Sequence, residues 1–211
     1  MSLSIHPIME QSFAVIDREI GEHNFSQAEY AIVRRVIHST ADFEFKHLIK
    51  FSPKAIAAGI AAICDRTPII TDVSMVKQGI TGLVAQTFGN PIISAVERAA
   101  SALPGKTRTE TGLIQCAVEF PQAIFVIGNA PTALLALCNL LPANASPALV
   151  IGAPVGFISV LESKATLAQT PVNQIRVEGR KGGSPVAAAI LNALIMLAWE
   201  QEKGWSMKDE V

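Results

Sequence analysis

Ala123-Ile124-Phe125-Val126-Ile127-Gly128 is a short, almost continuously apolar run that closes on a glycine. Two similar runs follow, residues 148–152 (Ala-Leu-Val-Ile-Gly) and 173–179 (Asn-Gln-Ile-Arg-Val-Glu-Gly), and residues 67–72 form an earlier β-rich run. Each run precedes a helix-like segment. Strands this apolar are typical of a parallel sheet that helices cover on both faces. The sequence therefore predicts an α/β fold, a three-layer α/β/α domain with a mainly parallel sheet.

The first helices are marked by signals at their amino ends. From Pro7 to about Glu22 the apolar residues recur at near-helical spacing, with proline in the first turn. Ser26 followed by Glu29 is a capping box, which predicts a second helix, and Ser52-Pro53 opens a third. No repeat or long polar linker divides the chain, so residues 1–211 are expected to form a single domain.

Composition excludes several classes of partner. The chain has 211 residues, half of them hydrophobic, a formal net charge of -1 and no long run of lysine or arginine. We therefore expect no nucleic-acid partner and no membrane. Val186–Ala198 is too short to span a bilayer, which takes roughly 20 residues, and Asn192 interrupts it. This segment is expected to be a core helix.

The three cysteines indicate a reducing compartment. Cys64, Cys116 and Cys138 are far apart, lie in apolar surroundings and form no C-x-x-C pair, so they are expected to be buried thiols. Their odd number, together with an amino end that lacks a basic-then-apolar leader, predicts a cytoplasmic protein.

Three loops follow the predicted strands: residues 128–132 (Gly-Asn-Ala-Pro-Thr), 152–156 (Gly-Ala-Pro-Val-Gly) and 179–185 (Gly-Arg-Lys-Gly-Gly-Ser-Pro). Parallel strands end on one edge of a sheet, so these loops should converge there. In the first and third, a proline at a helix start leaves backbone amides that could bind a carboxylate or phosphate. Arg180 and Lys181 would add charge. The alternative is three tight turns with exposed cations, and none of the loops matches a nucleotide-binding fingerprint.

The second helix is expected to end near His38, after Arg34 and Arg35. A helix carboxyl end carries partial negative charge and favours the imidazolium, which suits a proton donor. Asp42 could orient the imidazole or raise its pKa. Alternatively, His38 simply bonds to the free carbonyls of the last turn. The two arginines point about 100° apart, so only one of them, either Arg34 or Arg35, faces a pocket beside His38.

Other polar residues give weaker signals. His6, His23 and His47 lack the spacing of metal ligands, so no protein-bound metal and no cofactor are expected. Asp72 follows the first clear strand and lies on the presumed binding edge, although a capped turn explains it almost as well.

The chain resembles the precorrin-8X methylmutases, also called precorrin isomerases or cobalt-precorrin-8 methylmutases, of corrin-ring biosynthesis. Six sequence blocks in the family's order carry this resemblance, and they extend over nearly the whole chain. The blocks are His6-Pro7-Ile8 with Ser12, Arg35-Val36-Ile37-His38-Ser39-Thr40-Ala41-Asp42, Thr71-Asp72-Val73-Ser74-Met75-Val76, Ile127-Gly128-Asn129-Ala130-Pro131-Thr132-Ala133-Leu134, Gly152-Ala153-Pro154-Val155-Gly156-Phe157, and Gly179-Arg180-Lys181-Gly182-Gly183-Ser184.

The resemblance implies an isomerase that moves a methyl group from C11 to C12 of precorrin-8X or cobalt-precorrin-8, giving hydrogenobyrinate or cobyrinate. It implies that His38 is the general acid/base, that Ser12 and Arg35 bind the substrate, and that the protein is a homodimer. Arg180 and Lys181 are further candidates for substrate binding, on the physical character of their loop. Two alternatives stay open: a tetrapyrrole carrier that does not alter its ligand, and an unrelated binder of phosphate esters. Both the cobalt-containing and the cobalt-free substrate also remain possible.

Overall fold

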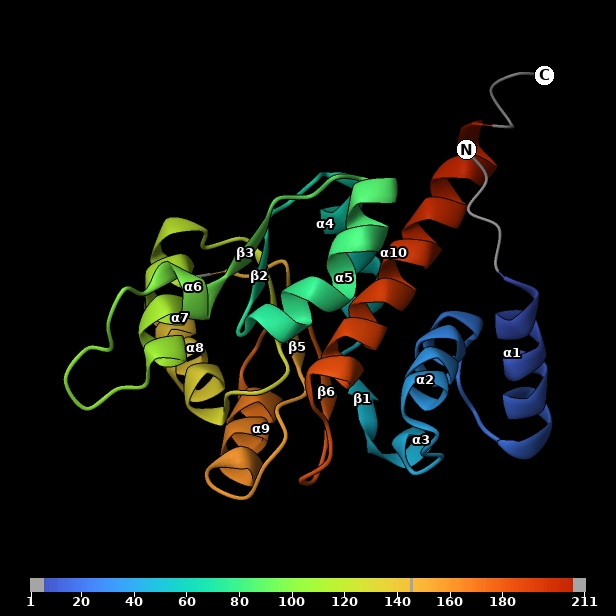
Figure 1. The fold of residues 1–211 in the computed structure, drawn as a ribbon, viewed down its shortest axis with the longest axis horizontal. Helices are drawn as coiled ribbons and strands as arrows, with labels where there is room; N and C mark the ends of the chain where they lie inside the picture. Colours follow the sequence, from blue (N-terminus) through green and yellow to red (C-terminus); the bar gives the residue numbers. More distant parts are fainter. Residues whose placement is uncertain (1–5, 145, 207–211) are drawn as a thin grey trace.

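The computed structural model describes residues 6–144 and 146–206. Its centre is a six-stranded sheet in the order β1-β6-β5-β4-β2-β3 (Figure 1). All neighbouring strands are parallel except β1, which pairs with β6 in the antiparallel direction. The strands are β1 (Ile49–Phe51), β2 (Ile69–Thr71), β3 (Ile92–Ser94), β4 (Ile124–Ile127), β5 (Leu149–Gly152) and β6 (Gln174–Val177).

The four β-rich runs of the sequence are β2, β4, β5 and β6, and the expected α/β class with a mainly parallel sheet is confirmed. The two edge strands, β1 and β3, are not predicted from the sequence. Each adjoins a four-residue helix, α3 or α6, with no turn residues between them, so the sequence does not set the strand apart from the helix.

Helices lie on both sides of the sheet, and they belong to two hydrophobic clusters. One cluster joins α1, α2, α4, α5 and α10 to one face of the sheet, and the other joins α6, α7, α8 and α9 to the opposite face (Figure 1). The helices are α1 (Pro7–Glu19), α2 (Gln27–Thr40), α3 (Phe45–Leu48), α4 (Ala55–Cys64), α5 (Ser74–Gln86), α6 (Ala95–Arg98), α7 (Arg108–Glu119), α8 (Pro131–Asn144), α9 (Val160–Gln169) and α10 (Ser184–Ser206).

Strand β4 shows why the strands are continuously apolar. Ile124 and Val126 belong to the first cluster, whereas Phe125 and Ile127 belong to the second, and all four side chains are fully buried. Successive side chains of a strand point to opposite faces, so a strand covered on both sides needs apolar residues at every position.

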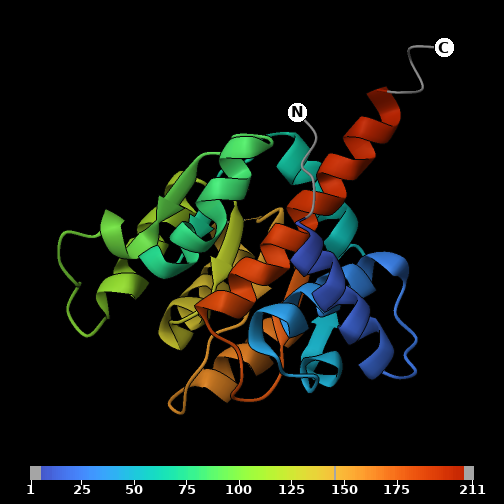
Figure 2. The ribbon, with the colours of Figure 1, turned by 45° about the vertical axis from the view of Figure 1, so that its right-hand side comes forward.

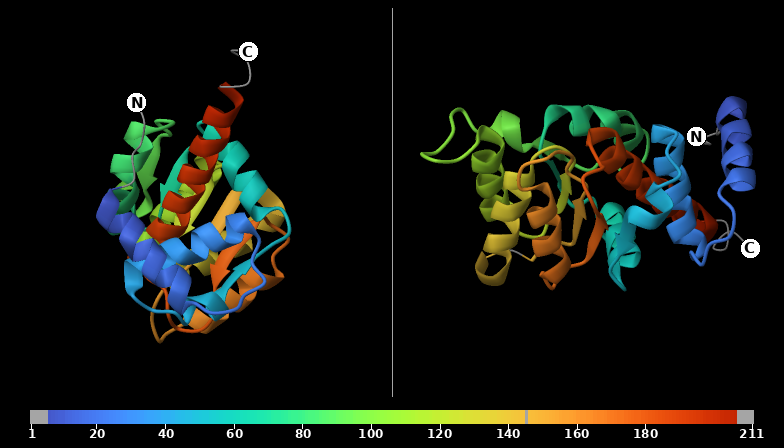
Figure 3. Two further views of the ribbon diagram at one scale, coloured as in Figure 1. Left: turned by 90° about the vertical axis from the view of Figure 1, so that its right-hand side faces the viewer. Right: turned by 90° about the horizontal axis from the view of Figure 1, so that it is seen from below.

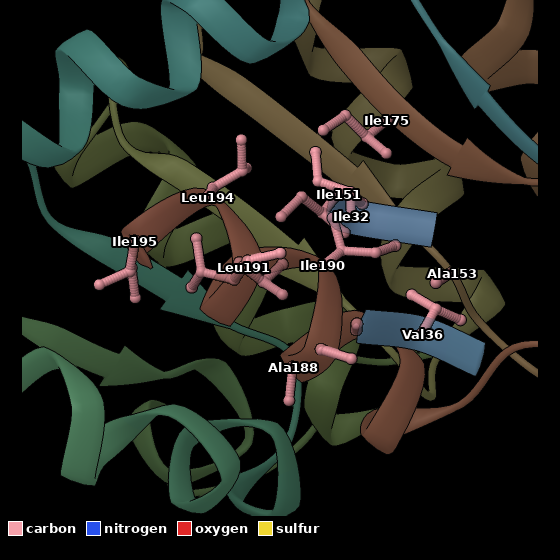
Figure 4. Close-up of a cluster of buried hydrophobic side chains, with 14 of the residues drawn as sticks. Ile32, Val36, Ile151, Ala153, Ile175, Ala188, Ile190, Leu191, Leu194 and Ile195 are labelled. Carbon is pink, nitrogen blue, oxygen red and sulfur yellow. The ribbon is translucent and has the colours of Figure 1, made fainter. Parts of the chain in front are cut away.

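Helix α10 is the main core helix. It crosses the sheet diagonally (Figure 2) and packs against α2, α5 and α4. Figure 4 shows its residues Ile190, Leu191 and Leu194 directed into the same cluster as Ile32 of α2 and Ile151 of β5. By length and composition alone it could cross a membrane, but 61% of its most apolar window is buried inside the protein. The expectation of a core helix in this segment is confirmed.

Helices α1 and α2 form a pair at the end of the molecule, with α2 lying between α1 and α10 (Figure 3). Pro7 begins α1, and the capping box of α2 is present: the Ser26 hydroxyl accepts from the Glu29 amide, and the Glu29 carboxylate accepts from the Ser26 amide. Helix α2 ends at Thr40 because Ala41 takes a left-handed conformation, with φ 53°. This pair carries most of the residues expected in the site.

The thiols differ from expectation at one position. Cys116 and Cys138 are buried, but Cys64 is exposed because it is the last residue of α4, at the turn into Asp65. Apolar neighbours in the sequence therefore do not predict whether a side chain at a helix end is buried.

Candidate functional site

The three glycine loops converge at the carboxyl edge of the sheet, as the sequence predicts. The amide of Gly183 in the third loop donates to the carbonyl of Ala153 in the second, at 2.8 Å. The amide of Gly156 donates to the carbonyl of Arg180, at 3.4 Å. A side chain at Gly128 would come within 2.9 Å of the backbone of Ser184, so the first loop and the start of α10 are also in close contact.

The amides of the first loop are already occupied. The backbone N–H groups of Asn129 and Ala130 donate to Oδ2 of Asp72, at 2.6 and 2.8 Å, and Oδ1 of Asp72 accepts from the Val73 amide. Asp72 is fully buried, and burial raises the pKa of its carboxyl while the amide donors oppose that rise. The anion expected beside Pro131 is therefore the protein's own carboxylate. It fills the point between β2 and β4 where the order of the strands reverses.

His38 lies in the last turn of α2, half-buried, with its ring edge-on to Phe13 of α1 at 5.3 Å between centroids. The neighbouring hydroxyls do not contact it: those of Ser39 and Thr40 both donate to the carbonyl of Val36. The imidazole makes no hydrogen bond to a carbonyl of the last turn among the described residues, so it does not cap the helix end.

The pKa of His38 is lowered from its ordinary value of 6.5, first because burial disfavours the imidazolium and second because Arg35 is a nearby positive charge. The expectation that the helix end and Asp42 would favour the charged form is wrong. The Asp42 carboxylate instead accepts from Lys181 Nζ at 2.7 Å and from the Glu44 amide at 2.9 Å. Burial and the charge of Arg35 thus both favour the neutral imidazole over the imidazolium in the free protein.

The two arginines have different surroundings. Arg34 forms an ion pair with Asp17 at 3.1 Å, and its guanidinium lies 4.4 Å from the centroid of the Phe13 ring. Arg35 is half-buried, and its guanidinium makes a weak contact from Nη1 to the Met9 sulfur, at 3.1 Å. Burial lowers the pKa of Arg35. Arg35 is thus a partly desolvated cation, without a carboxylate partner among the described residues, next to His38.

We expect Arg35→Gln to raise the pKa of His38 while leaving it below 6.5, because the substitution removes the positive charge but not the burial. An NMR titration of the imidazole measures this directly. Arg34→Gln is the matched control, since that guanidinium is paired with Asp17 and is not among the causes of the shift. Equal pKa values in the wild type and in Arg35→Gln would contradict this account of the electrostatics.

Ser12 lies on α1 beside Phe13, the residue that contacts His38. Its hydroxyl donates to the carbonyl of Ile8 at 2.9 Å, a bond within the helix, and the hydroxyl oxygen keeps acceptor capacity. Helix α1 therefore brings Ser12 to the same end of the molecule as Arg35 and His38.

Arg180 and Lys181 are adjacent but differ in role. Lys181 Nζ is held between Asp42, at 2.7 Å, and Glu44 Oε2, at 2.6 Å, so its charge is already neutralised by two carboxylates. These contacts raise the pKa of Lys181 and lower that of Asp42. Arg180 is exposed and has no side-chain partner within the described ranges. Of the two cations, Arg180 is the one available to a ligand.

Sequence reasoning missed two features of this edge. The loop after β5 exposes the large apolar side chains of Phe157 and Ile158, at 85% and 84%. A run of apolar residues directly after Gly156 is the signal for them. The second feature is Lys164, which is buried in α9. It lies four residues after Val160 and three before Leu167, both fully buried, so its spacing places it on the apolar face of the helix.

Among the described residues, neither a metal-binding cluster nor the two pockets lined by Asn173 add to the candidate site around His38. Within residues 6–144 and 146–206 no cluster of histidine, cysteine and acidic residues could hold a metal ion. Two neighbouring pockets, which include Asn173 and Ser146, lie at the amino ends of the strands, on the edge opposite His38.

Comparison with known proteins identifies the family of this chain. The family model for precorrin-8X methylmutase matches residues 7–197. A cobalt-precorrin-8 methylmutase from Synechocystis is 59% identical, covering 93% of this chain and 97% of the relative. A precorrin-8X methylmutase from Pseudomonas aeruginosa is 38% identical, covering 89% and 93%. The crystal structure of a precorrin-8X methylmutase from Thermus thermophilus superposes with a TM-score of 0.85 at 42% identity, covering 93% of this chain and 99% of that one.

The fold and these relatives define an α/β enzyme of the isomerase class, a methylmutase of cobalamin biosynthesis. The chain belongs to the precorrin-8X methylmutase family. The resemblance found in the six sequence blocks is thereby confirmed.

Proposed function

We propose that this protein moves the methyl group at C11 of precorrin-8X or cobalt-precorrin-8 to C12, with His38 as the general acid/base. The observation that carries the proposal is the position of His38, half-buried against Phe13 and next to Arg35, a cation with no acidic partner in the described chain. The names of the relatives from Synechocystis and Pseudomonas aeruginosa support the choice of substrate.

In this mechanism the imidazolium of His38 protonates the conjugated macrocycle. Protonation withdraws electron density from the ring and promotes the [1,5] shift of the methyl group, after which the proton returns to the histidine. No atom is gained or lost, so the net reaction is an isomerisation. Proton transfer of this kind contributes about 10²–10⁴-fold to the rate.

The lowered pKa of His38 is compatible with this cycle because a bound substrate would raise that pKa again. A carboxylate arm of the macrocycle that binds Arg35 would neutralise the charge that lowers the pKa of His38. The imidazole would then take up a proton as the substrate binds. Arg35 is suited to this role because its planar guanidinium binds a carboxylate through two parallel hydrogen bonds.

Ser12 and Arg180 are proposed to hold other polar arms of the same substrate. Ser12 is on the helix that packs against His38, and Arg180 is on the loop that Lys181 ties to the turn after α2. Lys181 itself is proposed to act indirectly, by fixing this loop, because both of its carboxylate partners come from the protein.

Single-turnover absorbance tests the reaction. The purified protein is mixed with precorrin-8X and, separately, with cobalt-precorrin-8. Conversion to the spectrum of the corrin product supports the isomerase and shows which substrate it prefers. Binding without conversion would make it a carrier, and affinity for nucleotides without affinity for tetrapyrroles would indicate a binder of phosphate esters.

We further propose that the protein is a cytoplasmic homodimer. Four exposed apolar side chains between β5 and the first turn of α9 support a dimer, because apolar surface exposed to water is a typical sign of a protein interface. They are Val155, Phe157 and Ile158 in the loop and Leu161 at the start of α9, with exposed fractions of 43–85%. The three cysteines are free thiols, which is compatible with a reducing compartment.

The dimer proposal predicts that Phe157→Asp halves the molar mass measured by light scattering after size exclusion. The charge would have to be buried in the interface, where an unpaired carboxylate is costly. Val118→Asp is the control, since Val118 is also exposed, at 65%, but lies on α7. A wild-type protein with the mass of one chain would contradict the proposal.

A further inference from the structure

Lys164 is a buried lysine that the proposed reaction does not use. Only 3% of the residue is exposed, and its ammonium lies against the loop that follows β6. Nζ donates to the carbonyl of Gly179 at 2.8 Å and to the carbonyl of Lys181 at 2.7 Å. It has no acidic partner among the described residues, so backbone dipoles alone compensate its charge.

Burying an ammonium in this way is unfavourable, and burial lowers the pKa of Lys164 to about 8. A well-packed apolar side chain would cost less at this position of α9. The two hydrogen bonds from Lys164 therefore serve to fix the conformation of the loop and not to stabilise the protein as a whole.

The residue between the two bound carbonyls is Arg180. Its own carbonyl accepts from the amide of Gly156, at 3.4 Å, so three successive carbonyls of the loop are held from outside it. The next side chain, Lys181, anchors the loop to Asp42 and Glu44 in the turn after α2. The backbone around Arg180 is thus held on one side by α9, and the next side chain ties it on the other to the turn that follows the helix of His38.

We propose that Lys164 is a positioning residue, which together with Lys181 holds the 179–183 loop so that the Arg180 guanidinium is presented to a carboxylate arm of the tetrapyrrole. This inference rests on the proposed function, because it assumes a ligand with several carboxylates. It assigns Lys164 no contact with the substrate. Lys164 holds the backbone of this short segment, and the Lys181 side chain ties it to the turn after α2.

The first test examines the loop without any ligand. Lys164→Met removes the ammonium and keeps an unbranched side chain of similar length. We expect hydrogen exchange at the amides of residues 179–183 to speed up, whereas Lys106→Met, an exposed lysine paired with Glu110 on α7, leaves these amides unchanged. Unchanged exchange in Lys164→Met would overturn the proposal, and this result does not depend on whether the protein is a methylmutase.

The second test is a double-mutant cycle with the hydrogenobyrinate product as the probe. We expect Lys164→Met to raise the Kd about tenfold, the size of effect that corresponds to removing one interaction with a charged group. The same substitution should raise KM with little change in kcat. In an Arg180→Gln background the same substitution should have almost no effect. Equal weakening in both backgrounds would show that Lys164 does not act through Arg180.

Two further outcomes separate this inference from the proposed function. If the wild-type protein binds no corrinoid, the proposed function fails, while the exchange measurement still reports on the loop. If Lys164→Met does not fold, Lys181→Met decides instead, because Lys181 is exposed and its removal should speed the same amides. Unchanged exchange in Lys181→Met would then overturn the two-lysine arrangement.

Discussion

His38→Ala is expected to lower the turnover rate by about 10²–10⁴-fold while the fold and the binding of corrinoid product are retained. The expectation follows from the position of the imidazole, at the end of α2 and with no hydrogen-bond partner in the described chain that would give it a structural role. Alanine at this position removes the edge-on packing of the imidazole against Phe13, which contributes little to the overall stability. The measurement is single-turnover absorbance, with circular dichroism to verify folding.

His47→Ala is the matched control, because His47 is an exposed histidine on α3, outside the proposed site. It should keep the wild-type rate. Addition of free imidazole to His38→Ala should restore part of the turnover if the missing group transfers a proton, whereas a purely structural defect would not respond. A correctly folded His38→Ala protein with a near-normal rate would refute the assignment.

The features that could be predicted from the sequence are those that neighbouring residues determine. The capping box of Ser26 and Glu29 needs only four residues, and the strands β4, β5 and β6 have four residues each. The convergence of the glycine loops also follows, because parallel strands connected by crossovers must end on the same edge.

The electrostatics of the site could not be predicted in this way. The helix end alone favours a charged His38, but burial against α1 and the charge of Arg35 have the opposite effect. Asp42, which is close to His38 in the sequence, bonds to Lys181, 139 residues away. Side-chain partners of this kind depend on the tertiary packing of α2 against the loop after β6, which no local pattern specifies.

Asp72 and Lys164 illustrate the same limit for buried charges. The first loop offers amides to an anion, as its sequence indicates, but the anion comes from the end of β2 and not from a ligand. The face of α9 that carries Lys164 is apolar at Val160 and Leu167, so periodicity shows that the lysine is buried but not which carbonyls it binds.

Gly182→Ala is expected to destabilise the protein by about 3 kcal/mol, from backbone strain and overpacking together. Gly182 has φ +152°, a conformation that other residues rarely adopt, and a Cβ atom there would lie 2.3 Å from the carbonyl oxygen of Ala153 and 2.9 Å from that of Pro154. Both obstacles are backbone atoms, so the loop after β6 has to move away from the loop after β5. Urea denaturation measures the loss of stability.

The same displacement should affect the reaction, because Arg180 and Lys181 lie on the loop that moves. A shift of about 1 Å in a binding group can lower kcat/KM on the order of 10²-fold. Gly179→Ala distinguishes backbone strain from steric clash. Gly179 also has a positive φ, +71°, but no atom lies within 4 Å of its added Cβ. That variant should lose only about 1 kcal/mol, the cost of a left-handed residue, and keep most of its activity. Equal losses in the two variants would show that close contact between the loops does not shape the site.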